Sequence, residues 1–213
     1  MDFGELLKVV ADEPVFETGL LLAGEVDPAG VRRQLSRWVQ AGRLYQLRRG
    51  LYGLAPPFQR VKPHPFLVAN RLMRGSYVSL QSALAHYGLI PEHVPVTTSV
   101  TTGRPGQWQT PLGTYDFRHV QSEILTGYRR MDLGGGQEAF VATPEKALLD
   151  LVHLEPGADT PEYLHELRLQ HLEVLSLDNL RRMAEASGRP KQIRAAEQIA
   201  RLAEAEALEY QLL

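Results

Sequence analysis

Arginine is concentrated in one short part of the chain, where its chemistry points to a negatively charged partner. Residues 27–60 hold seven arginines and one acidic residue, Asp27, whereas the whole 213-residue chain has a net charge of −2. Guanidinium groups bind phosphate oxygens, and they pair with the O6 and N7 atoms of guanine. A basic stripe on a nearly neutral chain therefore predicts contact with nucleic acid, and the alternative is a solvated basic surface.

A second group of polar residues has the types that acid–base or anion-binding chemistry needs. Lys146 and Asp150 are four residues apart, so they are neighbours on one helix face, and Glu145 lies one position further round. With polar residues from an earlier segment, they are expected to form a face that binds a phosphate. The set consists of Ser79, Gln81, Ser82, Glu145, Lys146 and Asp150. The alternative is an exposed ion pair worth about 0.3–0.5 kcal/mol at a helix start.

Other patterns of catalysis and metal binding do not occur in the sequence. The chain has no cysteine, and its seven histidines never stand four residues apart, so neither thiolate chemistry nor a helical zinc pair is expected. No Gly-x-Ser-x-Gly or Ser-x-x-Lys pattern is present, and the glycines at 134–136 fit a hairpin turn better than a phosphate loop. We therefore expect no enzyme activity, no metal and no cofactor.

The elements around the arginines follow the order of a winged helix-turn-helix. Helices are predicted over residues 2–11, 17–24 and 27–41, the third opened by an Asp-Pro pair and ended by Gly42. Two short apolar runs around residues 48–50 then predict a hairpin, which would be the wing.

The third predicted helix separates an apolar side from a charged side. Val31, Leu35 and Trp38 fall together and would pack on the first two helices, whereas Arg33 and Arg37 lie opposite. A helix of this kind fits the major groove of DNA, with the hairpin beside it on phosphate or the minor groove. The residues expected to contact DNA are Arg32, Arg33, Gln34, Arg37, Arg43, Arg48 and Arg49.

Prolines between residues 56 and 65 mark a boundary, so we expect one domain over 1–58 and a second over 62–213. The second domain should contain helices over 66–73 and 80–87, strands over 96–102, 113–120, 124–133 and 138–142, and helices that begin near residues 143, 160, 177 and 190. The expected fold class is α+β: a winged helix followed by an α+β domain with a small, mostly antiparallel sheet and C-terminal helices.

Three separated motifs give the chain a resemblance to a known family. They are GRLYQLRRGLY at 42–52, YVSLQSALAHYGL at 77–89 and VATPEKALLDL at 141–151. In this order they resemble the AbiEi-type antitoxins and related transcriptional regulators of type IV toxin–antitoxin systems, which are linked to abortive infection. The resemblance covers roughly residues 3–155.

The resemblance implies two linked roles. The winged helix would bind inverted or direct repeats in the protein's own promoter and repress the operon. The second domain would counteract a nucleotidyltransferase-like toxin without needing a stable complex with it, and the polar face around Lys146 and Asp150 would carry that activity.

Three other functions stay open at this point. The chain is alternatively a stand-alone regulator with a ligand-sensing second domain, an enzyme on a DNA-binding module, or an interaction scaffold. The acidic N-terminal segment and the lack of an apolar run of about 20 residues predict a cytoplasmic protein with no membrane segment.

Overall fold

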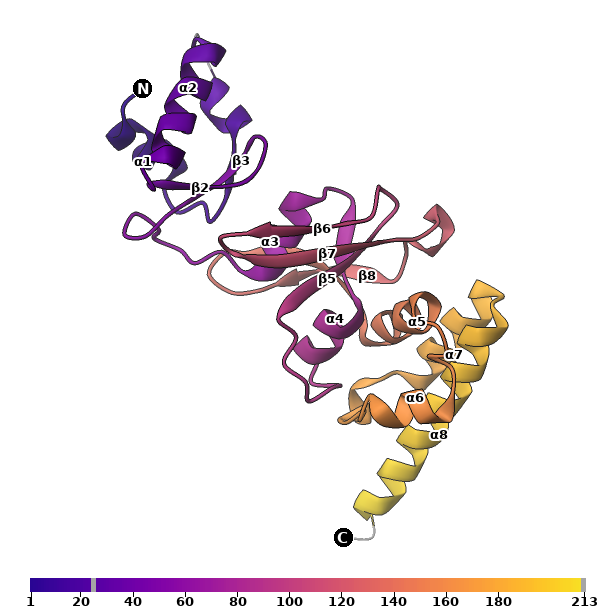
Figure 1. The fold of residues 1–213 in the computed structure, drawn as a ribbon. Coiled ribbons are helices and arrows are strands. Elements are labelled where there is room, and N and C mark those ends of the chain that lie inside the picture. The colour runs from indigo at the N-terminus through magenta and orange to yellow at the C-terminus, as the bar shows by residue number, and fades with distance from the viewer. Residues whose placement is uncertain (24–25, 212–213) are drawn as a thin grey trace.

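Figure 1 shows a computed structural model, which describes residues 1–23 and 26–211. This part of the chain is mixed α+β, with eight α-helices and two sheets of three and six strands. The elements form three tiers along the molecule: a first tier (1–58), a middle tier (62–142) built on the larger sheet, and a third tier (143–211) of helices. The predicted α+β class is confirmed.

The first tier places two α-helices and a 3-10 helix around three short strands. Its elements are α1 (Phe3–Val10), β1 (Phe16–Glu17), the 3-10 helix η1 (Thr18–Leu22), α2 (Pro28–Gln40), β2 (Leu44–Arg48) and β3 (Leu51–Leu54), and the strands lie in the order β1-β3-β2. Asp27 begins α2 by accepting hydrogen bonds from the backbone N–H groups of Ala29 and Gly30 at 2.9 and 2.8 Å. The predicted helices over 2–11 and 27–41 and the predicted hairpin are confirmed.

The prediction of an α-helix over residues 17–24 is wrong. The segment begins in β1, which pairs with β3, and continues only as the 3-10 helix η1. These few residues include Gly19 and cannot offset the cost of starting an α-helix. Pairing with the hairpin satisfies the backbone instead, since Thr18 N donates to Gly50 O at 2.9 Å. Gly24 lies outside the described residues.

A small core holds the first tier together. Trp38 is only 7% exposed, as its predicted core position requires, and its ring meets the Phe3 ring edge to face with centroids 5.4 Å apart. The buried members of this cluster, called the small core below, are Leu6, Val10, Phe16, Leu21, Val31, Leu35, Trp38, Leu44, Tyr52 and Leu54.

The middle tier is a mixed sheet with α3 (Pro65–Leu72) and α4 (Leu80–His86) beside it. Its strands are β4 (Ser76–Val78), β5 (Val96–Thr101), β6 (Gly106–Thr110), β7 (Gly113–His119), β8 (Tyr128–Asp132) and β9 (Glu138–Ala142), in the order β6-β7-β5-β4-β9-β8. The pairs β4–β5, β6–β7 and β8–β9 are antiparallel, whereas β5–β7 and β4–β9 are parallel.

The sheet is mostly antiparallel, as the sequence predicts, but it has six strands and includes two parallel pairs. The sequence pattern misses β4 and β6, and the segment predicted as a strand from 124 begins with the 3-10 helix η2 (Ser122–Ile124). Both parallel pairs join strands that are not consecutive, so no local turn signal announces them. The glycines at 134–136 do form the turn between β8 and β9, each with a positive φ.

The described part of the third tier consists of four α-helices that start where the sequence predicts and a short 3-10 helix that the sequence pattern misses. They are α5 (Pro144–Leu154), α6 (Pro161–Glu166), the 3-10 helix η3 (Leu172–Val174), α7 (Leu177–Ser187) and α8 (Pro190–Gln211). α8 packs against α7 and α5, and its far end extends past the other helices (Figure 1). The last two residues of the predicted final helix, 212–213, lie outside the described residues. Within the described chain, no helix combines the length and apolar character needed to span a membrane.

The first and middle tiers are joined by apolar packing. Val15, Leu47 and Leu51 come from the first tier, but they are buried in the large core that holds the sheet and α3. The hairpin therefore packs on the middle tier as well as on α2. The division into domains at 58–62 stays a prediction.

Candidate functional site

The basic side of α2 is exposed, as the helical pattern predicts. Arg32, Arg33 and Arg37 are exposed, and Gln34 is half-buried, whereas the opposite side of the helix lies in the small core. Arg33 makes a salt bridge with Asp27 at 3.3 Å, but both side chains are more than 60% exposed, so this pair holds the guanidinium only weakly. These side chains are free to meet a large partner.

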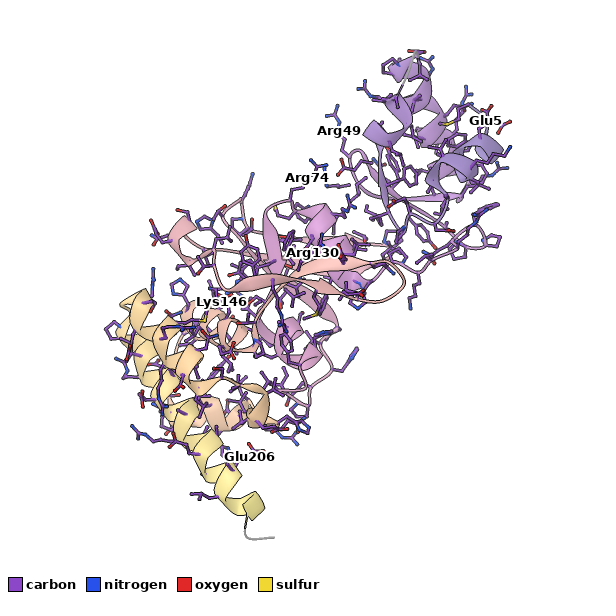
Figure 2. The ribbon with its side chains drawn as sticks, turned by 180° about the vertical axis from the view of Figure 1, so that it is seen from behind. Glu5, Arg49, Arg74, Arg130, Lys146 and Glu206 are labelled. Carbon is purple, nitrogen blue, oxygen red and sulfur yellow. The ribbon has the colours of Figure 1, made fainter. Side chains whose placement is uncertain are left out.

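The arginines that flank the hairpin differ in their surroundings. Arg43 is exposed, and its guanidinium lies over the Phe3 ring at 5.0 Å from the centroid. Arg49 is exposed at the hairpin tip, on the side that faces the middle tier and Arg74 in Figure 2. Arg48 is half-buried at a contact between the first and middle tiers.

The guanidinium of Arg48 bonds groups of the first and middle tiers at this contact. Its Nε and Nη2 atoms donate to the Arg71 carbonyl at 3.4 and 3.2 Å, and Nη2 lies 3.9 Å from the Glu17 carboxylate. Glu17 also binds Arg74 at 2.6 Å. Arg48 therefore joins the hairpin to α3, which the sequence pattern did not predict.

The second predicted set is not on the surface. Ser79, Ser82, Glu145, Lys146 and Asp150 are all at most 6% exposed, and only Gln81 is half-buried. The alternative of an exposed ion pair is therefore wrong, whereas phosphate binding by this set stays a prediction. The cause of the burial is the packing of α5 against α4, α7 and α8, which a helical repeat alone does not reveal.

Lys146 and Asp150 form a buried ion pair at the centre of this set. The Lys146 ammonium bonds one carboxylate oxygen of Asp150, and the other oxygen accepts from Ser79 Oγ at 2.7 Å and Tyr77 OH at 2.9 Å. Burial raises the pKa of Asp150, while Lys146 and the two hydroxyl donors act against that rise. Burial and then the nearby carboxylate also raise the pKa of Tyr77, so its phenol stays protonated as a donor.

The serines of the 77–89 motif fix the start of α4. Ser82 Oγ accepts from Thr98 N at 2.8 Å and donates to Val96 O at 3.0 Å, and Thr98 Oγ1 donates to Ser79 O at 2.8 Å. These bonds hold Leu80 in a left-handed conformation with φ of 53°, which is costly for a non-glycine residue. Ser79 is at the N-cap position of α4, but its side chain bonds Asp150 instead of capping the helix.

Glu145 has a structural partner of its own. Its carboxylate accepts from Ser176 N at 2.9 Å and from Asn179 Nδ2 at 3.3 Å, at the beginning of α7. A carboxylate there satisfies free backbone N–H groups and favours the positive end of the helix dipole. The 141–151 motif therefore anchors both the sheet and α7.

The histidines do not form a metal site in the described part of the chain, where no three His, Asp or Glu side chains gather as ligands. The rings of His64 and His86 both contact the Phe66 ring, with centroids 4.9 and 5.3 Å from it. Burial lowers the pKa of both, so both imidazoles are neutral near neutral pH.

Two parts of the site escape the sequence pattern. Tyr77 points the same way as Ser79, because alternate residues of a strand share a side, but this signal requires β4 to be recognised first. Arg189 and Gln192 line one cavity together with Lys146, and only the packing of α8 on α5 brings them there.

A scan against protein-family models finds none that matches the chain, and a search of curated proteins finds no relative.

Proposed function

We propose that residues 1–58 form a winged helix-turn-helix and that this cytoplasmic protein represses its own promoter. The order of elements supports this proposal: η1 precedes α2, and the hairpin of β2 and β3 follows it. In such a module the second helix of the pair enters the major groove, so α2 takes the place of the recognition helix.

The exposed basic side of α2 is the observation that carries the proposal. Its arginines face solvent while Val31, Leu35 and Trp38 anchor the helix in the small core. A helix that presents exposed guanidinium groups, of which only Arg33 has a weak exposed partner in Asp27, is suited to the grooves of nucleic acid, and guanine bases accept from arginine at two atoms.

The surroundings of each side chain suggest its role. Arg33 and Arg37 share the outward side of α2, so we assign them to base contacts, with Gln34 and Arg32 at the flanks. Arg43, which follows α2, and Arg49 at the hairpin tip are both exposed and suit phosphate contacts. Arg48 is withdrawn from this assignment, because it bonds the Arg71 carbonyl and lies near Glu17.

Substitution of these arginines should separate base contacts from phosphate contacts. We expect Arg33→Ala or Arg37→Ala to weaken binding to DNA from upstream of the gene by about 1–3 kcal/mol, with little effect on unrelated DNA. Arg49→Ala should weaken binding to both DNAs alike and reduce the slope of log affinity against log salt by about 1. Fluorescence anisotropy over a range of salt concentrations measures both effects.

Arg201→Ala is the matched control, because Arg201 is exposed on α8 in the third tier and its loss changes the net charge equally. Arg48→Ala should behave differently from Arg49→Ala, with a lower melting temperature and an unchanged salt slope. If Arg33→Ala, Arg37→Ala and Arg201→Ala all bind as tightly as wild type, α2 is not the recognition helix.

We further propose that the protein is the antitoxin of a type IV system and counteracts a nucleotidyltransferase-like toxin. This part of the proposal rests on the resemblance at 77–89 and 141–151. Most polar residues of those two motifs are buried, so Lys146 and Asp150 do not contact a large partner directly. We therefore assign antitoxicity to the exposed residues of the second domain around these motifs.

Co-expression with the neighbouring gene tests the antitoxin role in the full chain. We expect the wild-type protein to restore growth when that gene is toxic. The double variant Arg33→Ala/Arg37→Ala should restore growth equally while it fails to repress a promoter fusion, because its changes are confined to α2. Failure of the wild-type chain to restore growth would remove the antitoxin role and leave the DNA-binding proposal intact.

One observation favours a second candidate, a regulator with a ligand-sensing second domain. A cavity opens beside Lys146, between α5, α7 and α8.

A further inference from the structure

The cavity beside Lys146 has the features of a binding site for a small molecule. Its volume is about 170 Å³, enough for several waters or one small organic molecule and below the size of typical drug sites. It lies between η2, α5, α7 and the first turn of α8. The lining residues that bear on the ligand are Lys146, Leu149, Met183, Arg189 and Gln192.

Gln192 lines this cavity and carries an unused acceptor. The residue is 4% exposed, and its Nε2 atom donates to the Leu149 carbonyl at 2.8 Å. That bond fixes the amide, because the reversed orientation would bring two oxygens together. The remaining atom, Oε1, is buried and has no hydrogen-bond partner. A buried acceptor left unpaired costs about 1–3 kcal/mol, so the site favours a ligand that donates a hydrogen bond.

Arg189 supplies a positive charge to the same cavity. It is half-buried, its Nη1 atom donates to the Ser187 carbonyl at 3.3 Å, and within the described residues no carboxylate lies in salt-bridge range of it. The other cation of the wall, Lys146, is already neutralised by Asp150. One acid, Glu123, also lines the cavity, and its side chain is exposed and outside salt-bridge range of Arg189. An anionic group on a ligand would complete the ion pair that Arg189 lacks.

Apolar side chains form the remaining wall. Leu149 is buried, and Met183 is half-buried with a flexible thioether that adapts to the shape of a ligand. A short carbon skeleton between the anionic group and the donor therefore fits between these side chains.

We propose that the cavity binds a small carboxylic acid that carries a hydroxyl or ammonium group. The carboxylate pairs with Arg189, the donor bonds Gln192 Oε1, and the carbon chain contacts Leu149 and Met183. The site lies between the middle and third tiers, away from α2, and its test does not depend on DNA binding. If the DNA proposal also holds, this site gives the repressor a small-molecule input.

Matched probes test this assignment on the full chain without DNA. L-lactate and propionate share a carbon skeleton and a carboxylate, but only lactate has the donor; glycine and acetate make the same comparison with an ammonium group. We expect lactate or glycine to bind at least tenfold more tightly than its partner, about 1.4 kcal/mol, in isothermal titration calorimetry. Propane-1,2-diol, which lacks the carboxylate, should bind as weakly as propionate.

Two variants keep the test decisive. Gln192→Met removes the acceptor at nearly constant volume, and Arg189→Gln removes the charge at a half-buried position where misfolding is not expected. Each should lower the affinity for the better probe at least tenfold in protein with a wild-type circular dichroism spectrum. The proposal is overturned if neither lactate nor glycine binds in the millimolar range, which would mean that the cavity holds water only. It is also overturned if both variants bind as the wild type does.

Discussion

Replacing Asp150 with alanine is expected to lower the free energy of unfolding by about 3–5 kcal/mol, because it leaves the buried ammonium group of Lys146 without a partner. The side chains of Lys146 and Asp150 are 4% and 0% exposed, so water does not take the place of the lost carboxylate. The hydroxyl groups of Tyr77 and Ser79 also lose their shared acceptor. Urea denaturation near neutral pH, followed by circular dichroism, measures the loss.

An exposed ion pair of the same kind provides the control. Arg130 and Glu138 are 3.3 Å apart with side chains 68% and 47% exposed, so Glu138→Ala should cost less than about 1 kcal/mol. The double variant Lys146→Met/Asp150→Asn should lose less than the sum of its single changes, because it leaves no unpaired charge and keeps an acceptor for the two hydroxyls. Similar losses for Asp150→Ala and Glu138→Ala would contradict a buried charge at this position.

Replacing Leu35 with alanine is expected to destabilise the first tier by about 2–5 kcal/mol. Leu35 is fully buried in the small core, whose few side chains cannot readily close the cavity that the change creates. Because this core is separate from the large one, amide protection should fall mainly in residues 1–58. Hydrogen exchange followed by segment in the intact chain gives the comparison.

Leu148→Ala is the counterpart in the large core, where Leu148 is also fully buried. It should lower protection in the middle and third tiers and affect α1 and α2 less. If both variants lower protection equally along the whole chain, residues 1–58 and 62–213 are one cooperative unit. The packing of Val15, Leu47 and Leu51 into the large core would then be its cause.

Local signals account for the elements that the sequence predicts correctly. α2 begins at an Asp-Pro pair and stops before Gly42, whose φ is 68°, so both ends are specified by adjacent residues. β4 has no such signal: it is three residues long and buried on both sides, so its sequence lacks the alternation of a half-exposed strand. The segment that became β1 and η1 has apolar residues at helical spacing, but pairing with β3 outweighs that preference.

The candidate site was predictable in its residue types but not in its burial. The spacing of Lys146 and Asp150 indicates a pair on one helix turn, and the pair is present. The burial of this pair depends on Tyr77 and Ser79, which come from the 77–89 motif. It also depends on the helices that follow α5. For the same reason the bond from Arg48 to the Arg71 carbonyl could not be foreseen, because it depends on how the hairpin meets α3.

The central position of β4 also determines the order in which the strands of the larger sheet can pair during synthesis. β4 pairs with β5, which follows it closely, and with β9 through Val78 and Val141, which is made much later. The side of β4 that receives β9 therefore stays unpaired while the intervening residues are translated. An open strand edge is a template for pairing with other chains, so growing polypeptides on neighbouring ribosomes are most exposed to mispairing until Glu138–Ala142 has emerged.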